Sequence, residues 1–301
     1  MSRTIVGLAC GALLAGACAP APAGPRDPVR QEQLTGDEAA NAAGARATAI
    51  AFVRAYGAAD PAGLAVMTAL AGTPMVHDWV HWQGVQYSEF PGTVAGSVDL
   101  RTASVAAPVA AIPGTSAVLR EVALDAEITF DYRPTDGDPF SGMRTIDAIQ
   151  VGRTETSPWA VVDLVRDGVP LSTFFQPVGD PVEGNGVSVE LDSFVADPSA
   201  GSWQFDLVVR TVIERGLTLD RESAVLIDAE GKQIAAATYV STSLTAIGPG
   251  PPAEGLVRFD ALDDAGGLTL RLTFSGSAGT GAAEFPLERE IEPVAGASSA
   301  A

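Results

Sequence analysis

The chain has 301 residues, of which 47% are apolar, so it can bury one large core or two smaller ones and is not disordered as a whole. Its formal net charge of −19 at pH 7 argues against electrostatic binding to nucleic acid or to an anionic lipid surface. We therefore expect a folded protein of two domains with no nucleic-acid partner.

The first eighteen residues have the pattern of an export leader. Arg3 supplies a positive charge, and the apolar stretch Ile5–Leu14 that follows is too short to span a bilayer as a helix. Three small residues at 15–17 then precede Cys18 in the manner of a signal-peptidase site. The sequence predicts a removable signal peptide over residues 1–17.

The run from Leu14 to Cys18 resembles the lipobox of bacterial lipoproteins, in which the cysteine is diacylated on sulfur and becomes the mature N-terminus. The usual leucine three places before the cysteine is Ala15 here. Cys10, the other cysteine, lies within the leader, so the mature chain would hold one thiol, and acylation uses it. The resemblance implies lipidation of Cys18 with palmitate-like chains and a position on the outer side of the cell membrane. The alternative is a freely secreted protein.

Composition divides the rest of the chain into a tether, two domains and a tail. Residues 18–45 are rich in Ala, Pro and Gly and are predicted to form a flexible tether behind the lipidated cysteine. We expect a first domain over 46–178, a linker rich in Pro, Gly and Asp, and a second domain over 185–292. Residues 293–301 form a small-residue tail of no expected structure.

The first domain is predicted to open with three short helices. One has apolar residues at the i, i+3, i+4, i+7 spacing of a single buried face: Ala49, Phe52, Val53 and Tyr56. The pairs Asp60–Pro61 and Thr73–Pro74 each place a capping side chain before a proline at the first helical position. Both pairs indicate helix starts.

Strands are predicted to follow these helices. Residues 121–132 alternate apolar and charged side chains, which is typical of a long half-buried strand. Further strands are expected near 145–151, 159–165 and 169–175, the last two joined by the favoured turn pair Asp167–Gly168.

Helices followed by a meander of long antiparallel strands resemble the nuclear-transport-factor-like fold, a cone-shaped α+β fold in which a curved sheet wraps a helix. The resemblance covers residues 46–178 and depends on the order of elements. It implies an N-terminal α+β cone-like domain with an apolar cavity. Ketosteroid isomerase and polyketide-cyclase-type enzymes belong to this family, as do exported proteins without known catalysis, so the fold alone does not decide between them.

The two histidines of the chain, His77 and His81, lie four residues apart and would share one face of a helix, as paired metal ligands do. They are candidates for a zinc or copper site or for an acid–base pair. However, Met75, Trp79 and Trp82 form the apolar face of this helix, so both imidazoles are expected to point toward solvent. No third ligand can be identified, and no cofactor is expected.

Carboxylates of the first domain have two further interpretations. Asp131, Asp136 and Asp138 could gather a calcium ion, but they do not follow EF-hand spacing, and a solvated turn is favoured. Asp163 and Tyr132 could occupy a cavity of the ketosteroid isomerase kind, and we assign neither of them a role.

The second domain is predicted to consist of strands throughout, because short alternating runs recur at regular intervals. The turn over 228–232, the Pro/Gly step at 247–250 and the Gly-x-Val-x-Phe strand at 255–259 resemble the immunoglobulin-like extracellular domains common in bacterial lipoproteins. The resemblance implies an all-β immunoglobulin-like sandwich without catalytic residues.

Together these patterns favour a lipid-anchored cell-envelope protein of non-enzymatic binding or scaffolding type. Its expected partners are the membrane, through the N-terminal anchor, and an envelope protein or a small apolar ligand. The alternative is an enzyme that uses the cavity of the cone, which would require titratable groups inside it.

Overall fold

The computed structural model describes most of the chain between Glu38 and Leu287. The described residues are 38–89, 92–106, 118–134, 139–154, 156–179, 181–184, 187–197, 202–212, 216–260, 262, 267–277 and 279–287. The expected signal peptide, Cys18, most of the tether and the tail at 293–301 lie outside them.

Four α-helices occur in these ranges. They are α3 (Glu38–Ala58), α4 (Pro61–Leu70), α5 (Pro74–Glu89) and the one-turn α6 (Leu171–Phe174), and two short 3-10 turns follow at Arg221–Ser223 and Thr242–Leu244. The first three helices form where the sequence predicts them, although α3 begins at Glu38 and includes residues of the expected tether.

Both predicted helix starts are confirmed. The Gly63 amide donates a hydrogen bond to Asp60 Oδ1 over 2.6 Å, with Pro61 at the first position of α4. The Val76 amide likewise donates to Thr73 Oγ1 over 3.3 Å at the start of α5. Each cap satisfies an amide that the helix itself cannot pair, and so fixes where the helix begins.

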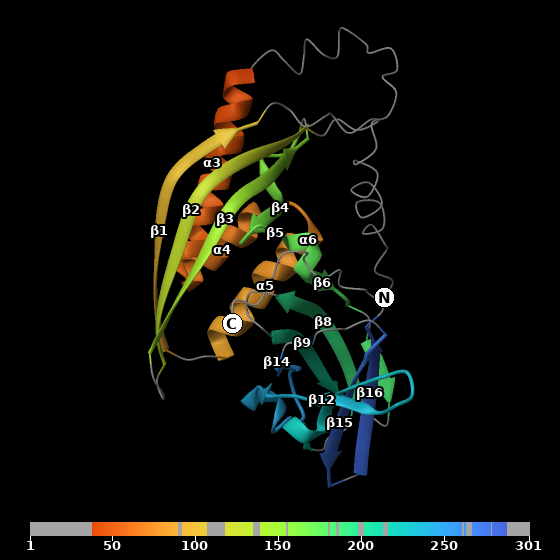
Figure 1. Cartoon of the computed structure of the whole chain (residues 1–301). Helices are drawn as coiled ribbons and strands as arrows, with labels where there is room; N and C mark the ends of the chain where they lie inside the picture. The colour runs from red at the N-terminus through yellow and green to blue at the C-terminus, as the bar shows by residue number, and fades with distance from the viewer. Residues whose placement is uncertain are drawn as a thin grey trace, which may run out of the picture.

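The first sheet is an antiparallel meander of five strands in chain order (Figure 1). Its strands are β1 (Gly92–Val105), β2 (Val118–Pro134), β3 (Phe140–Arg153), β4 (Ala160–Arg166) and β5 (Val169–Pro170). The turn between β4 and β5 is confirmed, with Asp167 and Gly168 at φ values of 52° and 78°. A β-bulge interrupts the pairing of the edge strand β1 with β2 between Leu100 and Thr102.

Helix α3 lies against this sheet at very close range. A Cβ atom on Gly96 of β1 would lie 1.7 Å from the carbonyl oxygen of Gly57, near the end of the helix. At the other end of α3, Nη2 of the buried Arg120 on β2 donates to Glu38 Oε2 over 2.7 Å. The helix is thus attached to the sheet at both ends.

The rest of the chain forms two more antiparallel sheets. The six-stranded sheet has the order β13-β14-β9-β8-β6, with β7 paired to β8, and the other has the order β10-β15-β11-β12, with β16 paired to β15. The strands are β6 (Phe175–Pro177), β7 (Pro181–Gly184), β8 (Val187–Asp197), β9 (Ser202–Thr211), β10 (Leu217–Thr218), β11 (Ala224–Ile227), β12 (Gln233–Ala236), β13 (Tyr239–Val240), β14 (Ala253–Asp260), β15 (Thr269–Gly276) and β16 (Gly279–Pro286).

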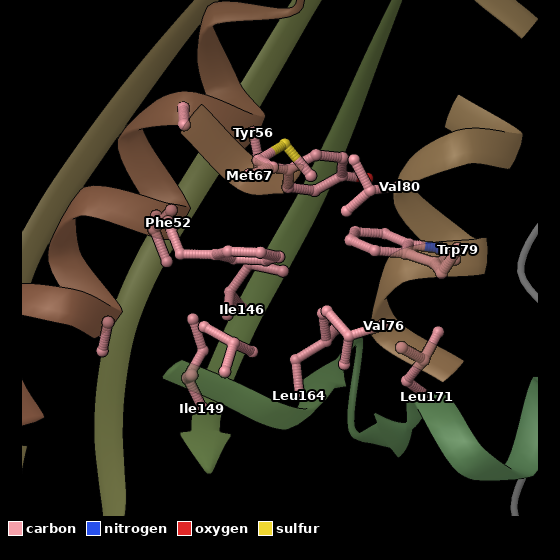
Figure 2. Packing of buried hydrophobic residues seen from close by; sticks show 14 of the residues in the cluster. Phe52, Tyr56, Met67, Val76, Trp79, Val80, Ile146, Ile149, Leu164 and Leu171 are labelled. Atoms are coloured by element: carbon pink, nitrogen blue, oxygen red, sulfur yellow. The ribbon is translucent and has the colours of Figure 1, made fainter. Parts of the chain in front are cut away.

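The buried apolar side chains gather in two clusters. One fills the space between the two later sheets, around Phe205, Phe259 and Phe274. The other lies under α3 and α5, where Trp79 points from α5 toward Phe52 and Tyr56 of α3 (Figure 2). This second cluster also takes in Val195 of β8 and Leu256 of β14, so it extends into the six-stranded sheet.

The predicted fold class, an α+β cone followed by an immunoglobulin-like sandwich, is wrong. The described chain is mostly β, in three antiparallel sheets with four α-helices, and neither architecture is present in it. The strand predicted over 169–175 breaks into β5, α6 and β6, and β6 pairs with β8 of the six-stranded sheet. Residues 181–184, within the expected linker, form strand β7 of the same sheet. Alternation along one strand does not encode which sheet that strand joins.

Candidate functional site

Helix α5 connects the first sheet and its helices to the six-stranded sheet. Its N-terminal half contributes Val76 and Trp79 to the cluster under α3. Its other side packs on β6, β8 and β14, where the ring of Trp82 meets that of Phe175 edge to face, with 6.5 Å between centroids. A polar residue on this second side of α5 is therefore placed directly over the sheet.

A groove runs between α4, α5 and the start of β14. It encloses about 280 Å³ and is open to solvent. Its lining is Leu64 and Thr68 from α4, Val80, His81, Gly84, Val85 and Ser88 from α5, and Glu254 from β14. The lining is thus mixed: three apolar side chains lie beside two hydroxyls and one pair of opposite charges.

The close approach of the helices gives the groove its shape. A Cβ atom on Gly63 of α4 would lie 2.3 Å from the carbonyl oxygen of Ala55, so only glycine lets α4 lie this close to α3. On the groove side, a Cβ atom on Gly84 would lie 3.7 Å from Leu64 Cδ1, an ordinary contact distance. Gly84 therefore leaves room in the groove that a larger side chain would fill.

His81 and Glu254 form an ion pair at one edge of the groove. His81 Nε2 donates to Glu254 Oε1 over 2.6 Å, and the two side chains are 47% and 37% exposed. The hydrogen bond to Glu254 raises the pKa of His81 to about 9, although burial of the ring opposes the shift. The imidazole is therefore a cation at neutral pH.

Three more carboxyl groups surround this pair. Burial raises the pKa of Asp78 on α5 and that of Asp192 on β8, and it raises the pKa of Asp206 on β9 well above the ordinary value. Asp206 is 1% exposed and accepts a hydrogen bond from Ser193 Oγ over 3.1 Å. Its Oδ1 and the Oδ2 of Asp192 are buried without a hydrogen-bond partner in the described structure.

The C-terminal end of α5 makes a second polar contact with the strands. The hydroxyl of Tyr239 on β13 donates to Glu89 Oε1, and the Thr242 amide donates to the same oxygen over 3.3 Å. Helix α5 is therefore attached to the β13–β14 edge at Glu89 and again at His81, two turns earlier, with the groove alongside.

The two histidines that the sequence singled out have different surroundings in the structure. Both lie on α5, but His77 is exposed, whereas His81 is engaged with Glu254. Among the described residues, no group of three or more His, Cys, Asp or Glu side chains is arranged to hold a metal ion. The carboxylate that faces His81 is that of Glu254 on β14, 173 residues further along the chain.

The other candidate residues of the first domain do not come together. Tyr132 pairs with Phe140 at one end of β3, and Asp163 pairs with Gln150 ten residues further along, about 33 Å away at the usual strand rise. The Asp163 carboxyl accepts instead from the Leu164 amide and from Ser172 Oγ, and burial raises its pKa. Asp136 and Asp138 lie outside the described residues, and Asp131 accepts from Ser141 Oγ.

Sequence reasoning missed Glu254, Asp192 and Asp206. The alternation of β9 puts Phe205, Leu207 and Val209 in the core between the sheets, which leaves Asp206 on the face expected to be solvated. That face is covered, and Asp206 is buried. An acidic residue on a strand gives no sign in the sequence that a helix from another part of the chain lies over it.

No family model, curated protein or solved structure matches this chain. In the described residues, no helix combines the length and the apolar composition needed to cross a membrane.

Proposed function

We propose that this protein is an exported, lipid-anchored component of the cell envelope that acts by binding, without catalysis, and that its ligand occupies the groove between α4, α5 and β14. The anchor is proposed from the resemblance of the run ending at Cys18 to a lipobox. The observation that carries the binding site is the combination of three apolar side chains with one fixed ion pair, His81–Glu254, in a single concave surface.

The size of the groove restricts what it can take. Pockets for drug-sized ligands occupy about 300–1,000 Å³, so 280 Å³ fits a small apolar molecule. Leu64, Val80 and Val85 would contact its apolar part. Thr68, Ser88 and the ion pair would orient a polar end, as a few fixed polar groups do in most small-molecule sites.

The titratable groups of the site favour binding over catalysis. His81 is protonated at neutral pH and hydrogen-bonded to Glu254, so it is unsuited to act as a general base. Asp206, the carboxyl with the strongest shift in pKa, is 1% exposed and cannot reach a substrate in the groove. His81 thus lacks the free base form at neutral pH, and Asp206 lacks access to the groove.

Filling the groove tests the binding site. We expect Thr68→Trp, which places a large ring in the groove from an exposed position, to abolish binding of the neutral apolar probe N-phenyl-1-naphthylamine, measured by its fluorescence. Ala65→Trp, at an exposed position of α4 outside the groove, is the matched control and should bind as the wild type does. Equal binding by all three proteins, or no binding by the wild type, would refute the site.

The anchor is tested separately. The intact mass of membrane-extracted protein should show a mature N-terminus at a diacylated Cys18, and Cys18→Ala should leave the membrane fraction. An unmodified wild type in the soluble fraction would instead indicate a secreted protein.

A further inference from the structure

The acidic residues beneath α5 come from three neighbouring strands of one sheet. Glu254, Asp206 and Asp192 lie on β14, β9 and β8, which are adjacent in the order of the six-stranded sheet. Asp192 is the extra residue of a β-bulge, since the pairing of β8 with β9 shifts between Leu191 and Ser193. Bulges redirect side chains, and this one adds a carboxyl to the group that interacts electrostatically with His81.

The site contains few positive charges. The titratable groups that face one another here are Asp78 and His81 of α5, with His77 nearby on the same helix, Glu190 and Asp192 of β8, Asp206 of β9 and Glu254 of β14. Arg210 of β9 adds a positive charge, with its Nη2 3.2 Å from Glu190 Oε2. Five of these eight groups are acidic. Deprotonated together, the carboxylates would repel one another across the contact between α5 and the sheet.

Hydrogen bonding also favours the protonated forms. The two buried oxygens without a partner, Asp206 Oδ1 and Asp192 Oδ2, each lack a donor among the described groups. A buried carboxylate oxygen without a donor is costly, whereas a protonated carboxyl is neutral and avoids most of that cost. A proton on His81 also favours the contact between α5 and the sheet, because it makes the hydrogen bond to Glu254 charge-assisted.

We propose that His81, Glu254, Asp192 and Asp206 form a proton-operated latch between α5 and the six-stranded sheet. The latch is tight while His81 and the two aspartic acids hold their protons, and it loosens the groove-lining part of α5 when they release them. It needs no ligand, so it is independent of the proposed binding function. The groove would open as the pH rises.

The stabilising contributions of His81, Asp192 and Asp206 all decrease as the pH rises. The pKa of His81 is raised from 6.5 to about 9, so its stabilising contribution is complete below 6.5 and is lost as the pH rises through 9. The pKa values of Asp192 and Asp206 are also raised, so the protonated carboxyls favour the closed state, and this contribution is lost as each ionises above the ordinary carboxyl range.

Hydrogen exchange on the full chain tests the latch. We expect the protection of α5 amides, corrected for intrinsic exchange rates, to fall about fivefold relative to α3 between neutral and alkaline pH, as loss of a half-exposed ion pair predicts. Glu254→Gln should show the low protection already at neutral pH. Asp206→Asn, which mimics the neutral carboxyl, should keep α5 protected to higher pH than the wild type.

Imidazole NMR supplies the second measurement. The chain has two histidines, so a His77→Gln variant assigns both signals. His81 should titrate near pH 9 in the wild type and closer to 6.5 in Glu254→Gln. If His81 titrates identically in the two proteins, or if α5 exchange follows α3 at every pH, the latch is refuted. Circular dichroism of each variant ensures that only folded proteins are compared.

Discussion

Two glycines of the first sheet flank the same aromatic residue, and they should respond in opposite ways to one added methyl group. Gly96 of β1 and Gly142 of β3 both pair with Phe130 of β2, one on each side. A Cβ atom at Gly96 would lie 1.7 Å from the Gly57 carbonyl oxygen. A Cβ atom at Gly142 would have no described heavy atom outside its chain neighbours within 4 Å. The two Gly→Ala variants therefore differ in steric cost while sharing their place in the sheet.

The magnitudes follow from these contacts. Overpacking a filled site costs about 1–3 kcal/mol, and Gly96→Ala should lie near the upper end because the obstacle is helix backbone, which no side-chain rotation can relieve. Replacing glycine recovers about 0.5–1 kcal/mol by reducing the freedom of the unfolded chain. We expect Gly96→Ala to lower the free energy of unfolding by about 2 kcal/mol, and Gly142→Ala to raise it by about 0.5 kcal/mol.

Urea unfolding followed by far-UV circular dichroism measures both changes. The midpoint of Gly96→Ala should move to lower urea concentration, and that of Gly142→Ala should stay or move slightly higher. Equal shifts in the two variants would refute the close approach of α3 to β1, because the sheet environment of both glycines is otherwise alike.

Substitutions at three further positions test other contacts. Asp60→Ala removes the N-cap of α4 and should cost about 1 kcal/mol in urea unfolding, while Asp60→Asn should retain most of it. Leu272→Ala, at a fully buried position between the later sheets, should cost about 3 kcal/mol, and a loss below about 1 kcal/mol would contradict that packing. Ser193→Ala removes the described donor to Asp206, and an ionised carboxylate depends on that donor more than a neutral carboxyl does, so the loss of stability should grow as the pH rises from 4. An equal loss at every pH would argue against a titrating Asp206.

Local structure was predictable where one residue determines it. Asp60 and Thr73 cap helices as expected, and Asp167–Gly168 turns β4 into β5. Strand β1 gave little signal because it is an edge strand of mostly small residues with a half-exposed face, so its alternation has low contrast. Residues 181–184 have the composition of a linker but pair with β8, because strand pairing depends on the backbone of the partner.

The fold and the candidate site depend on contacts that are distant in sequence. His81 could be identified as an unusual residue on a helix, but the distance of 2.6 Å to Glu254 depends on how α5 lies over β14. The same packing buries Asp206 on a strand face that the pattern assigns to solvent. Sequence periodicity describes one element at a time, so neither contact could be derived from it.

The bulge in β1 has a consequence for how copies of the protein meet. β1 ends the first sheet over fourteen residues and, in the described structure, pairs with β2 alone, so its outer edge could template a strand from another molecule. The register shift between Leu100 and Thr102 interrupts the regular pairing of that strand in its second half. Arg101, between them, bonds Asp99 over 3.0 Å and lies 3.6 Å from both Asp125 and Glu127, which adds charge at the same place. Neighbouring copies of the protein would thus be kept from joining their first sheets edge to edge.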